Sequence, residues 1–133
     1  MIMTDLEKAR EFFAGDIFAT STSGIVIDEV GDRYAKCSMK IDDRHVNARG
    51  TVMGGAIYTL ADFTFAVAAN HQNPGTVSVV GQISYMGVAK GDTLIGESHL
   101  IKDGRSNCFY NIDITDNLGN KVATVSMNGV HLN

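Results

Sequence analysis

The residue best suited to do chemistry in this sequence is Asp62, the only charged residue between Arg49 and Lys90. A carboxylate among apolar neighbours loses part of its hydration, and a partly desolvated carboxylate can act as a general base or a nucleophile. The same residue can instead be a structural carboxylate that accepts hydrogen bonds from nearby Thr, Ser or backbone donors at the edge of the domain. The residue pattern alone leaves both interpretations open.

A second candidate is the glycine pair Gly54-Gly55, which opens the same apolar segment. Backbone N–H groups in the first turn of a helix have no partner inside it, and the helix dipole favours negative charge there. Glycines also let a ligand approach the backbone closely. The pair is therefore either an oxyanion hole for a reacting carbonyl or a tight turn into a helix. A phosphate-binding loop is excluded, because neither Gly50 nor Gly54 is followed by the required Lys pattern.

The spacing of these candidates has a geometric consequence. Eight residues separate Gly54 from Asp62, which is roughly 12 Å along a helix axis. One reacting carbonyl needs both groups within about 3 Å, so they cannot serve the same carbonyl from one chain. A two-fold dimer with antiparallel helices side by side would bring Gly54 of one subunit beside Asp62 of the other. If both residues are functional, the spacing predicts a homodimer with two shared sites.

The element that holds Asp62 is a helix expected over residues 56–70, apolar on nearly all sides and therefore buried on most of them. On a helical wheel of 100° per residue, two opposite stripes separate. The stripe of Asp62 is smaller and more polar, and holds Gly55, Tyr58, Thr59, Ala66 and Ala69. The opposite stripe holds Ile57, Leu60, Thr64 and Val67.

Shorter elements surround this helix. Thr4 and Glu7 fit a capping box that begins a short amphipathic helix, with apolar residues at Leu6, Ala9, Phe12 and Phe13. Strands are expected over residues 24–30 and 34–41, and the second alternates with Ala35, Cys37, Met39 and Ile41 on one face. Four more are expected over residues 76–86, 93–101, 106–115 and 121–131, and the short turns between them predict an antiparallel meander.

Together these elements predict an α+β fold in which one antiparallel sheet curls around one long central helix, with a short N-terminal helix. Residues 1–133 form a single domain, since no linker or repeat interrupts them. The net charge of −4 argues against a nucleic-acid or anionic-membrane partner. No targeting segment is present, and the most apolar stretch, residues 56–69, is too short to span a bilayer. Cys37 and Cys108 lack metal-type spacing and are expected to be small core residues of a cytoplasmic protein.

The segment His45–Gly55, followed by Leu60-Ala61-Asp62, resembles the signature of hotdog-fold acyl-CoA thioesterases. The likeness is greatest to the PaaI-like branch, named after phenylacetic acid degradation, and to the mammalian thioesterase-superfamily relatives. It runs over nearly the whole chain, and includes Val77-Ser78, Tyr85-Met86 with Ala89-Lys90, residues 102–105 and residues 116–119.

This resemblance implies a hotdog fold, an antiparallel sheet wrapped around one long helix, that pairs into dimers and commonly into dimers of dimers. It implies that Asp62 is the catalytic base or nucleophile and that the Gly54 N–H polarises the thioester carbonyl. It also implies that Asn47 and Ser78 hold substrate or water. The residues it places near the substrate or its coenzyme A arm are Met53, Gly55, Tyr85, Met86, Val88, Lys90, Lys102, Gly104, Arg105 and Ser106. Lys90, Lys102 and Arg105 can pair with phosphates, or each can be a solvated turn charge.

The implied function is hydrolysis of an acyl-CoA thioester to a free acid and coenzyme A, with no cofactor or metal beyond the substrate itself. Met53 departs from the family, which usually has His there, and a thioether cannot donate a proton. Met53 therefore favours an alternative, a non-catalytic hotdog protein that binds acyl-CoA as a sensor or structural subunit. A dehydratase acting on an acyl thioester would pair a His with its carboxylate. No His is placed beside Asp62, and His45 is expected to anchor its loop.

Overall fold

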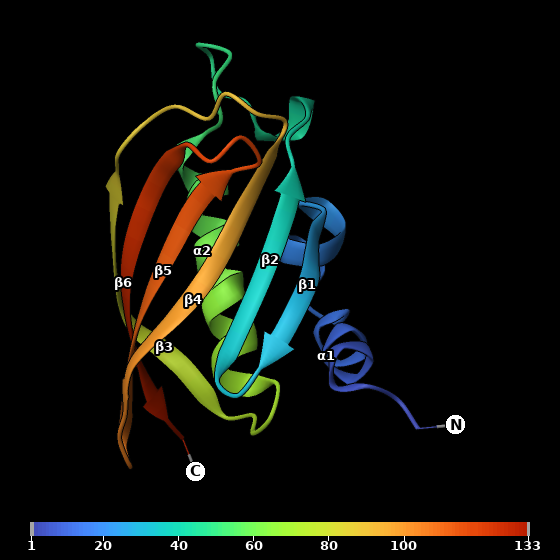
Figure 1. Ribbon diagram of the computed structural model, residues 1–133, viewed down its shortest axis with the longest axis vertical. Helices are drawn as coiled ribbons and strands as arrows, with labels where there is room; N and C mark the ends of the chain where they lie inside the picture. The colour runs from blue at the N-terminus through green and yellow to red at the C-terminus, as the bar shows by residue number, and fades with distance from the viewer. Residues whose placement is uncertain (1, 133) are drawn as a thin grey trace.

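One long helix, α2 (Gly54–Asn70), lies along the concave face of a strongly curved six-stranded antiparallel sheet (Figure 1). The computed structural model describes residues 2–132. The strands are β1 (Ile25–Gly31), β2 (Tyr34–Lys40), β3 (Thr76–Tyr85), β4 (Thr93–Asp103), β5 (Asn107–Asp116) and β6 (Lys121–His131). A short helix, α1 (Asp5–Phe13), precedes them. This is the hotdog architecture expected from the sequence, and α2 begins two residues earlier than expected.

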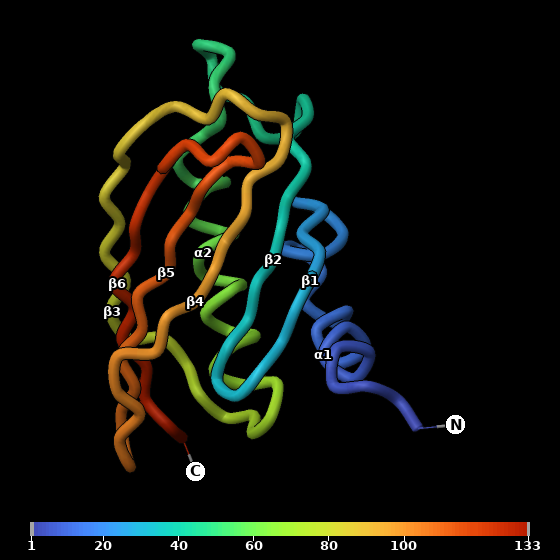
Figure 2. The backbone as a smooth tube through the Cα atoms, viewed as in Figure 1, coloured from blue at the N-terminus to red at the C-terminus, as the bar shows by residue number. Residues whose placement is uncertain are grey.

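The strand order is β1-β2-β4-β5-β6-β3. The expected meander is therefore correct for β4, β5 and β6 and wrong for β3, which pairs with β6 at the far edge. Figure 2 shows the chain after β3 passing over the end of the sheet before it enters β4. The residues between β3 and β4 thus form a crossover rather than a hairpin turn.

The buried carboxylate of Asp116 fastens this crossover. It accepts hydrogen bonds from the Lys90 N–H at 2.8 Å and the Gly91 N–H at 3.0 Å, and further ones from Leu118 and Asn120. Burial raises the pKa of Asp116, but the hydrogen bonds from Asn120, Lys90 and Gly91 outweigh it and hold the pKa well below its ordinary value. Five donors on one carboxylate fix the path of the chain where local turn chemistry does not.

The core lies between α2 and the concave face of the sheet. Ala35, Cys37 and Met39 are fully buried, as the alternation in that strand predicts, and Ile41 beyond the strand is half-buried. On α2, the stripe opposite Asp62 is buried, including Leu60. Each such large apolar side chain contributes about 1.5–3 kcal/mol when it leaves water. The stripe that holds Asp62 faces away from the sheet and is left partly open.

The N-terminal helix α1 packs against the outside of β1 (Figure 1). The capping box is confirmed, because the Thr4 side chain accepts from the Glu7 N–H and the Glu7 side chain accepts from the Thr4 N–H. The guanidinium of Arg10 donates twice to the carbonyl oxygen of Ile27, at 3.0 and 2.8 Å. Through these two bonds Arg10 docks the helix and covers part of the β1 edge. Phe12, expected on the buried stripe, is 59% exposed.

The other edge strand, β3, stays open. Its exposed side chains include Val77, Val79 and Val80, although valine normally favours burial in a strand. Both cysteines are free and buried, and burial raises the pKa of Cys37 to about 12. Across residues 2–132, no helix has both the length and the hydropathy to cross a bilayer.

Candidate active site

The first turn of α2 presents unpaired backbone donors. Met53 is the N-cap and makes no side-chain capping bond, and no described residue accepts from the N–H of Gly54 or Gly55. The positive end of the helix dipole adds to these donors, so the turn favours a developing negative charge. There is also a steric reason for glycine at position 54, since a Cβ there would lie 2.9 Å from the Tyr85 hydroxyl.

Tyr85, the last residue of β3, holds this turn from the side. Its hydroxyl donates to the carbonyl oxygen of Gly54 at 3.0 Å. The sequence singles out Tyr85 only through the family resemblance, which assigns it to the coenzyme A arm. The contact with Gly54 joins residues 31 positions apart, and no local pattern predicts it.

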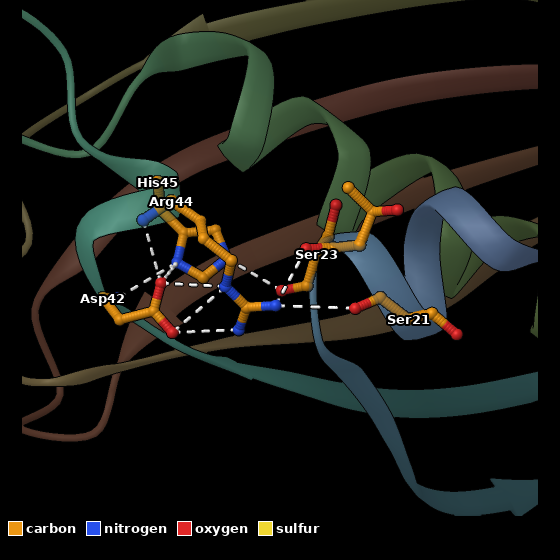
Figure 3. A network of polar contacts seen from close by, with 6 residues as sticks. Ser21, Ser23, Asp42, Arg44 and His45 are labelled. Carbon is orange, nitrogen blue, oxygen red and sulfur yellow. Dashed lines mark hydrogen bonds and ion pairs between the residues drawn. The ribbon is translucent and has the colours of Figure 1, made fainter.

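A polar network holds the loop that leads into α2 (Figure 3). The ring of His45 is buried, accepts from the Asp42 N–H at its Nδ1 and donates from its Nε2 to the carbonyl oxygen of Ser23. The carbonyl oxygen of His45 then accepts from the Met53 N–H at 2.7 Å. His45 is therefore confirmed as a loop anchor, with both ring nitrogens occupied.

Arg44 ties the same loop to the N-terminal segment. It pairs with both carboxylate oxygens of Asp42 and donates to the carbonyl oxygen of Thr22 at 2.9 Å. The hydrogen bonds from Arg44 lower the pKa of Asp42 to about 2. Thr22 ends a single π-helical turn, η1 (Phe18–Thr22), so Arg44 fixes η1 against the loop that leads into α2. No local pattern in the sequence points to a role for Arg44 or for η1.

Asp62 lies on the open stripe of α2, about two turns after Gly54. No hydrogen bond or ion pair joins its carboxylate to another of the residues 2–132. The nearby hydroxyl of Thr59 donates instead to the carbonyl oxygen of Gly55 at 2.8 Å. Lost hydration raises the pKa of Asp62, and the negative charge of Asp16 raises it further. An accessible carboxylate with no partner and a raised pKa has the properties of a general base.

Asn47 and Ser78 lie apart from each other on exposed positions. The Asn47 side-chain oxygen accepts from the Arg49 N–H at 2.9 Å and from Thr51, so it closes a tight loop just before α2. Its side-chain NH2 group has no partner among the described residues and is free to donate. Ser78 lies on β3 beside a bulge between Ser78 and Val80.

The residues assigned to the coenzyme A arm divide between the two ends of the fold. Tyr85, Met86, Val88 and Lys90 lie at the end where α2 begins. Lys102 lies near the end of β4, and Gly104, Arg105 and Ser106 form the β4–β5 turn, at the end where α2 finishes (Figure 1). A 17-residue helix is roughly 25 Å long, so one chain does not bring the two groups together.

Two pockets flank the first turn of α2. The β3 pocket, of about 260 Å³, is lined by Gly54 and Ile57 of α2, by Tyr85 and Val88, and by Thr51 and Val52. The η1 pocket, of about 460 Å³, lies between η1 and the first two turns of α2. Its lining residues include Phe18, Met53, Gly55, Ala56 and Thr59, with Arg44 and His45 behind them. The two consecutive glycines thus open onto different pockets.

Several known proteins resemble this chain in sequence or in fold. The family model described as "Thioesterase superfamily" matches residues 49–123. Acyl-coenzyme A thioesterase 13 from Homo sapiens is 33% identical over 99 residues, which cover 72% of this chain and 71% of that protein.

Two solved structures show the same fold at lower sequence identity. The Escherichia coli PaaI protein from the phenylacetic acid degradation operon superposes with a TM-score of 0.85 at 23% identity, covering 98% of this chain and 97% of that one. A hypothetical thioesterase from Streptococcus pneumoniae, solved with coenzyme A, has a TM-score of 0.82 at 20% identity, covering 90% and 95%.

Proposed function

Because the chain belongs to the thioesterase superfamily and is a thioester hydrolase, we propose that it hydrolyses acyl-coenzyme A and that Asp62 and Gly54 perform the reaction. The observation that carries this assignment is the unpartnered carboxylate of Asp62, whose pKa is raised, on the open stripe of α2. The same helix begins with unpaired N–H groups. A carboxylate base and an oxyanion hole are the two groups that thioester hydrolysis needs.

In the proposed reaction, the acyl carbonyl oxygen accepts a hydrogen bond from the Gly54 N–H. Asp62 of the opposite subunit removes a proton from water, and the water oxygen forms a bond to the carbonyl carbon. The C–S bond then breaks, and the departing thiolate takes up the proton. In the other route, Asp62 attacks the carbonyl carbon directly, the C–S bond breaks and the thiolate leaves, and water hydrolyses the resulting mixed anhydride. Single turnover in H2 18O identifies this route when water adds to the aspartyl carbonyl of the anhydride, because 18O then enters the Asp62 carboxylate, which the general-base route never labels.

The proposed homodimer places α2 of each subunit antiparallel to α2 of the other. The open stripe of α2 and the open edge of β3 supply surface for it, since exposed edge strands pair readily with another chain. This arrangement brings Gly54 of one subunit near Asp62 of the other, and the β4–β5 turn of one near the α2 start of the other. The two separated groups of coenzyme A residues would then meet at one site.

Coenzyme A is the proposed carrier of the acyl group. Two of the compared proteins support it, one by its name and one because it was solved with coenzyme A. Lys90 of one subunit and Lys102 and Arg105 of the other are the cations available to its phosphates. Asn47, with its free side-chain NH2, and Ser78 are proposed to hold the attacking water.

The test is thiol release from short, medium, long and aromatic acyl-CoAs by the wild type and by Asp62→Asn. We expect release by the wild type and a loss of roughly 100- to 10,000-fold in the variant, the usual contribution of a catalytic base. Dimerisation and affinity for coenzyme A are the controls and should stay unchanged. No release by either protein, with tight acyl-CoA binding by both, would instead support the second candidate, a non-catalytic acyl-CoA binder, which Met53 favours.

A further inference from the structure

The first turn of α2 divides the space around the reaction centre into two parts. Gly54 lines the β3 pocket and Gly55 lines the η1 pocket, on different sides of the same turn. A thioester whose carbonyl oxygen sits at this turn has two arms, the acyl group and the coenzyme A arm. The two pockets offer one space for each arm.

Resting on the proposed function, we propose that the η1 pocket holds the acyl group and that the substrate is an uncharged, apolar acyl thioester. The pantetheine end of coenzyme A then lies on the β3 side, where Tyr85, Val88 and Lys90 are found. Phe18 and Thr59 are the specificity-determining residues, because they line the pocket from its two bordering elements, η1 and α2.

The chemistry of the pocket wall supports an apolar occupant. Most of its polar groups already have partners: Arg44 pairs with Asp42 and the Thr22 carbonyl, His45 with the Ser23 carbonyl, and the Thr59 hydroxyl with the Gly55 carbonyl. A ligand meets mainly the ring of Phe18, the thioether of Met53 and the methyl groups of Ala56 and Thr59. The small hydroxyls of Thr22 and Ser23 and the N–H of Gly55 are the polar groups beside them that have no partner within residues 2–132. Methionine adapts its shape to apolar ligands.

The same pairing argues against a charged acyl group. The guanidinium of Arg44 is the one cation in the pocket lining, and the carboxylate of Asp42 already neutralises it. An acyl group with a terminal carboxylate would lose hydration there without gaining a counter-charge. The pocket therefore discriminates between acyl groups of equal length by charge.

The size of the pocket sets the length of the acyl group. A methylene group occupies about the volume of a water molecule, roughly 30 Å³, so about 460 Å³ sets an upper limit of about 15 methylene groups and accommodates a decanoyl chain or an aromatic ring. The wall formed by η1 is fastened by Arg44 and His45, so it does not simply move aside for a longer chain.

The experiment measures kcat/KM for acetyl-, butyryl-, hexanoyl-, decanoyl- and succinyl-CoA. In the wild type we expect a rise of about fourfold per methylene over the shorter chains, the usual gain from burying one. Succinyl-CoA should be at least tenfold poorer than butyryl-CoA. Thr59→Leu fills the pocket and should lower kcat/KM for decanoyl-CoA at least tenfold more than kcat/KM for acetyl-CoA. Phe18→Ala removes one wall and should flatten the dependence on chain length.

The matched control is Phe12→Ala, which removes the same side chain from α1, where it is 59% exposed compared with 63% for Phe18. Its chain-length profile should be that of the wild type. If each of Thr59→Leu and Phe18→Ala changes kcat/KM by the same factor for every acyl length, the inference is overturned and the proposed function still stands. If the wild type releases no thiol at all, the proposed function fails. The pocket is then tested by the affinity of S-alkyl-CoA thioethers for the same variants, and a dependence on chain length that Phe18→Ala does not flatten overturns it.

Discussion

The Tyr85 hydroxyl lies 3.0 Å from the carbonyl oxygen of Gly54, so the last residue of β3 holds the first residue of α2. The peptide unit that carries this carbonyl carries the Gly55 N–H at its other end, one residue beyond the proposed oxyanion donor. A hydroxyl on the carbonyl side limits rotation of that peptide and keeps the neighbouring donors aimed at the site.

Tyr85→Phe should therefore reduce activity without unfolding the protein. A neutral hydrogen bond contributes about 0.5–1.5 kcal/mol, and we expect kcat/KM to fall by roughly three- to tenfold. The control is Tyr34→Phe, which removes a hydroxyl that donates to Glu97 away from the site. Steady-state kinetics and thermal unfolding of both variants check this, and equal losses of activity in the two would refute a specific role for Tyr85.

The two glycines should respond differently to alanine. In Gly54→Ala the new Cβ would meet the Tyr85 ring and hydroxyl at 2.9–3.3 Å, so we expect at least a tenfold loss of activity and no gain in stability. In Gly55→Ala the nearest atom is the Met53 methyl carbon at 3.6 Å, an ordinary contact. Alanine there should raise the free energy of unfolding by about 0.5–1 kcal/mol through helix propensity. Urea denaturation curves measure the stability of both variants, and thiol release measures their activity.

The raised pKa of Asp62 predicts the acid side of the pH–rate profile. A base works only when ionised, so kcat/KM should fall as the pH drops through a pKa above the ordinary value for Asp, about 3.9. Asp16→Asn removes a negative charge that raises this pKa, so the acid limb should move to lower pH. Asp28→Asn, on β1, is the control and should leave the limb in place.

The raised pKa of Asp62 also predicts that its charge destabilises the folded protein at neutral pH. A carboxyl whose pKa is raised by folding destabilises the folded state above that pKa, and the penalty disappears below the unfolded value. Asp62→Asn should therefore unfold at higher temperature than the wild type at neutral pH, and the difference should vanish in acid. A constant difference at every pH would show that charge is not its cause.

His45 should behave as an anchor rather than a catalyst. His45→Ala leaves the part-buried Asp42 N–H and the buried Ser23 carbonyl without their partners, and we expect a loss of about 2–4 kcal/mol in the free energy of unfolding. The value of kcat per folded molecule should change far less than stability. His99→Ala, which alters a half-exposed ring on the outer face of the sheet, should leave stability nearly unchanged.

The open edge of β3 should be required for dimerisation. Val79→Asp places a charge on a side chain that is 58% exposed at this edge, and we expect monomers and loss of thiol release. The control is Leu118→Asp, at a side chain that is 66% exposed in the β5–β6 turn. Sedimentation velocity measures the mass of each variant. An active monomeric Val79→Asp variant would contradict a site shared between subunits.

Local signals in the sequence predict the elements well. Thr4 and Glu7 begin α1 because a capping box depends on residues three apart, and Ala35, Cys37 and Met39 report one face of β2 because strand periodicity is local. Asp62 stands out because it is a lone charge in an apolar helix. Each of these inferences depends on neighbours along the chain.

What the sequence does not predict depends on contacts between distant segments. The pairing of β3 with β6 requires a crossover, which the hydrogen bonds to the Asp116 carboxylate fasten, whereas the turn residues before β4 look like those of a hairpin. The contact of Tyr85 with Gly54, and the approach of Phe18 to the start of α2, join segments more than 30 residues apart. No periodicity reports such contacts, because they exist only in the folded chain.

The strand order also has a consequence for the chain as the ribosome makes it. β3 ends at Tyr85, but its only partner strand within residues 2–132 begins at Lys121. At about 5–20 residues per second, roughly 2 to 7 s of synthesis separate the two strands. During that time the valines of β3 have no strand to pair with, in a segment of high β-propensity with few charges. Newly made chains are therefore most vulnerable to aggregation before β6 emerges, and β3 is where a chaperone would do most to protect them.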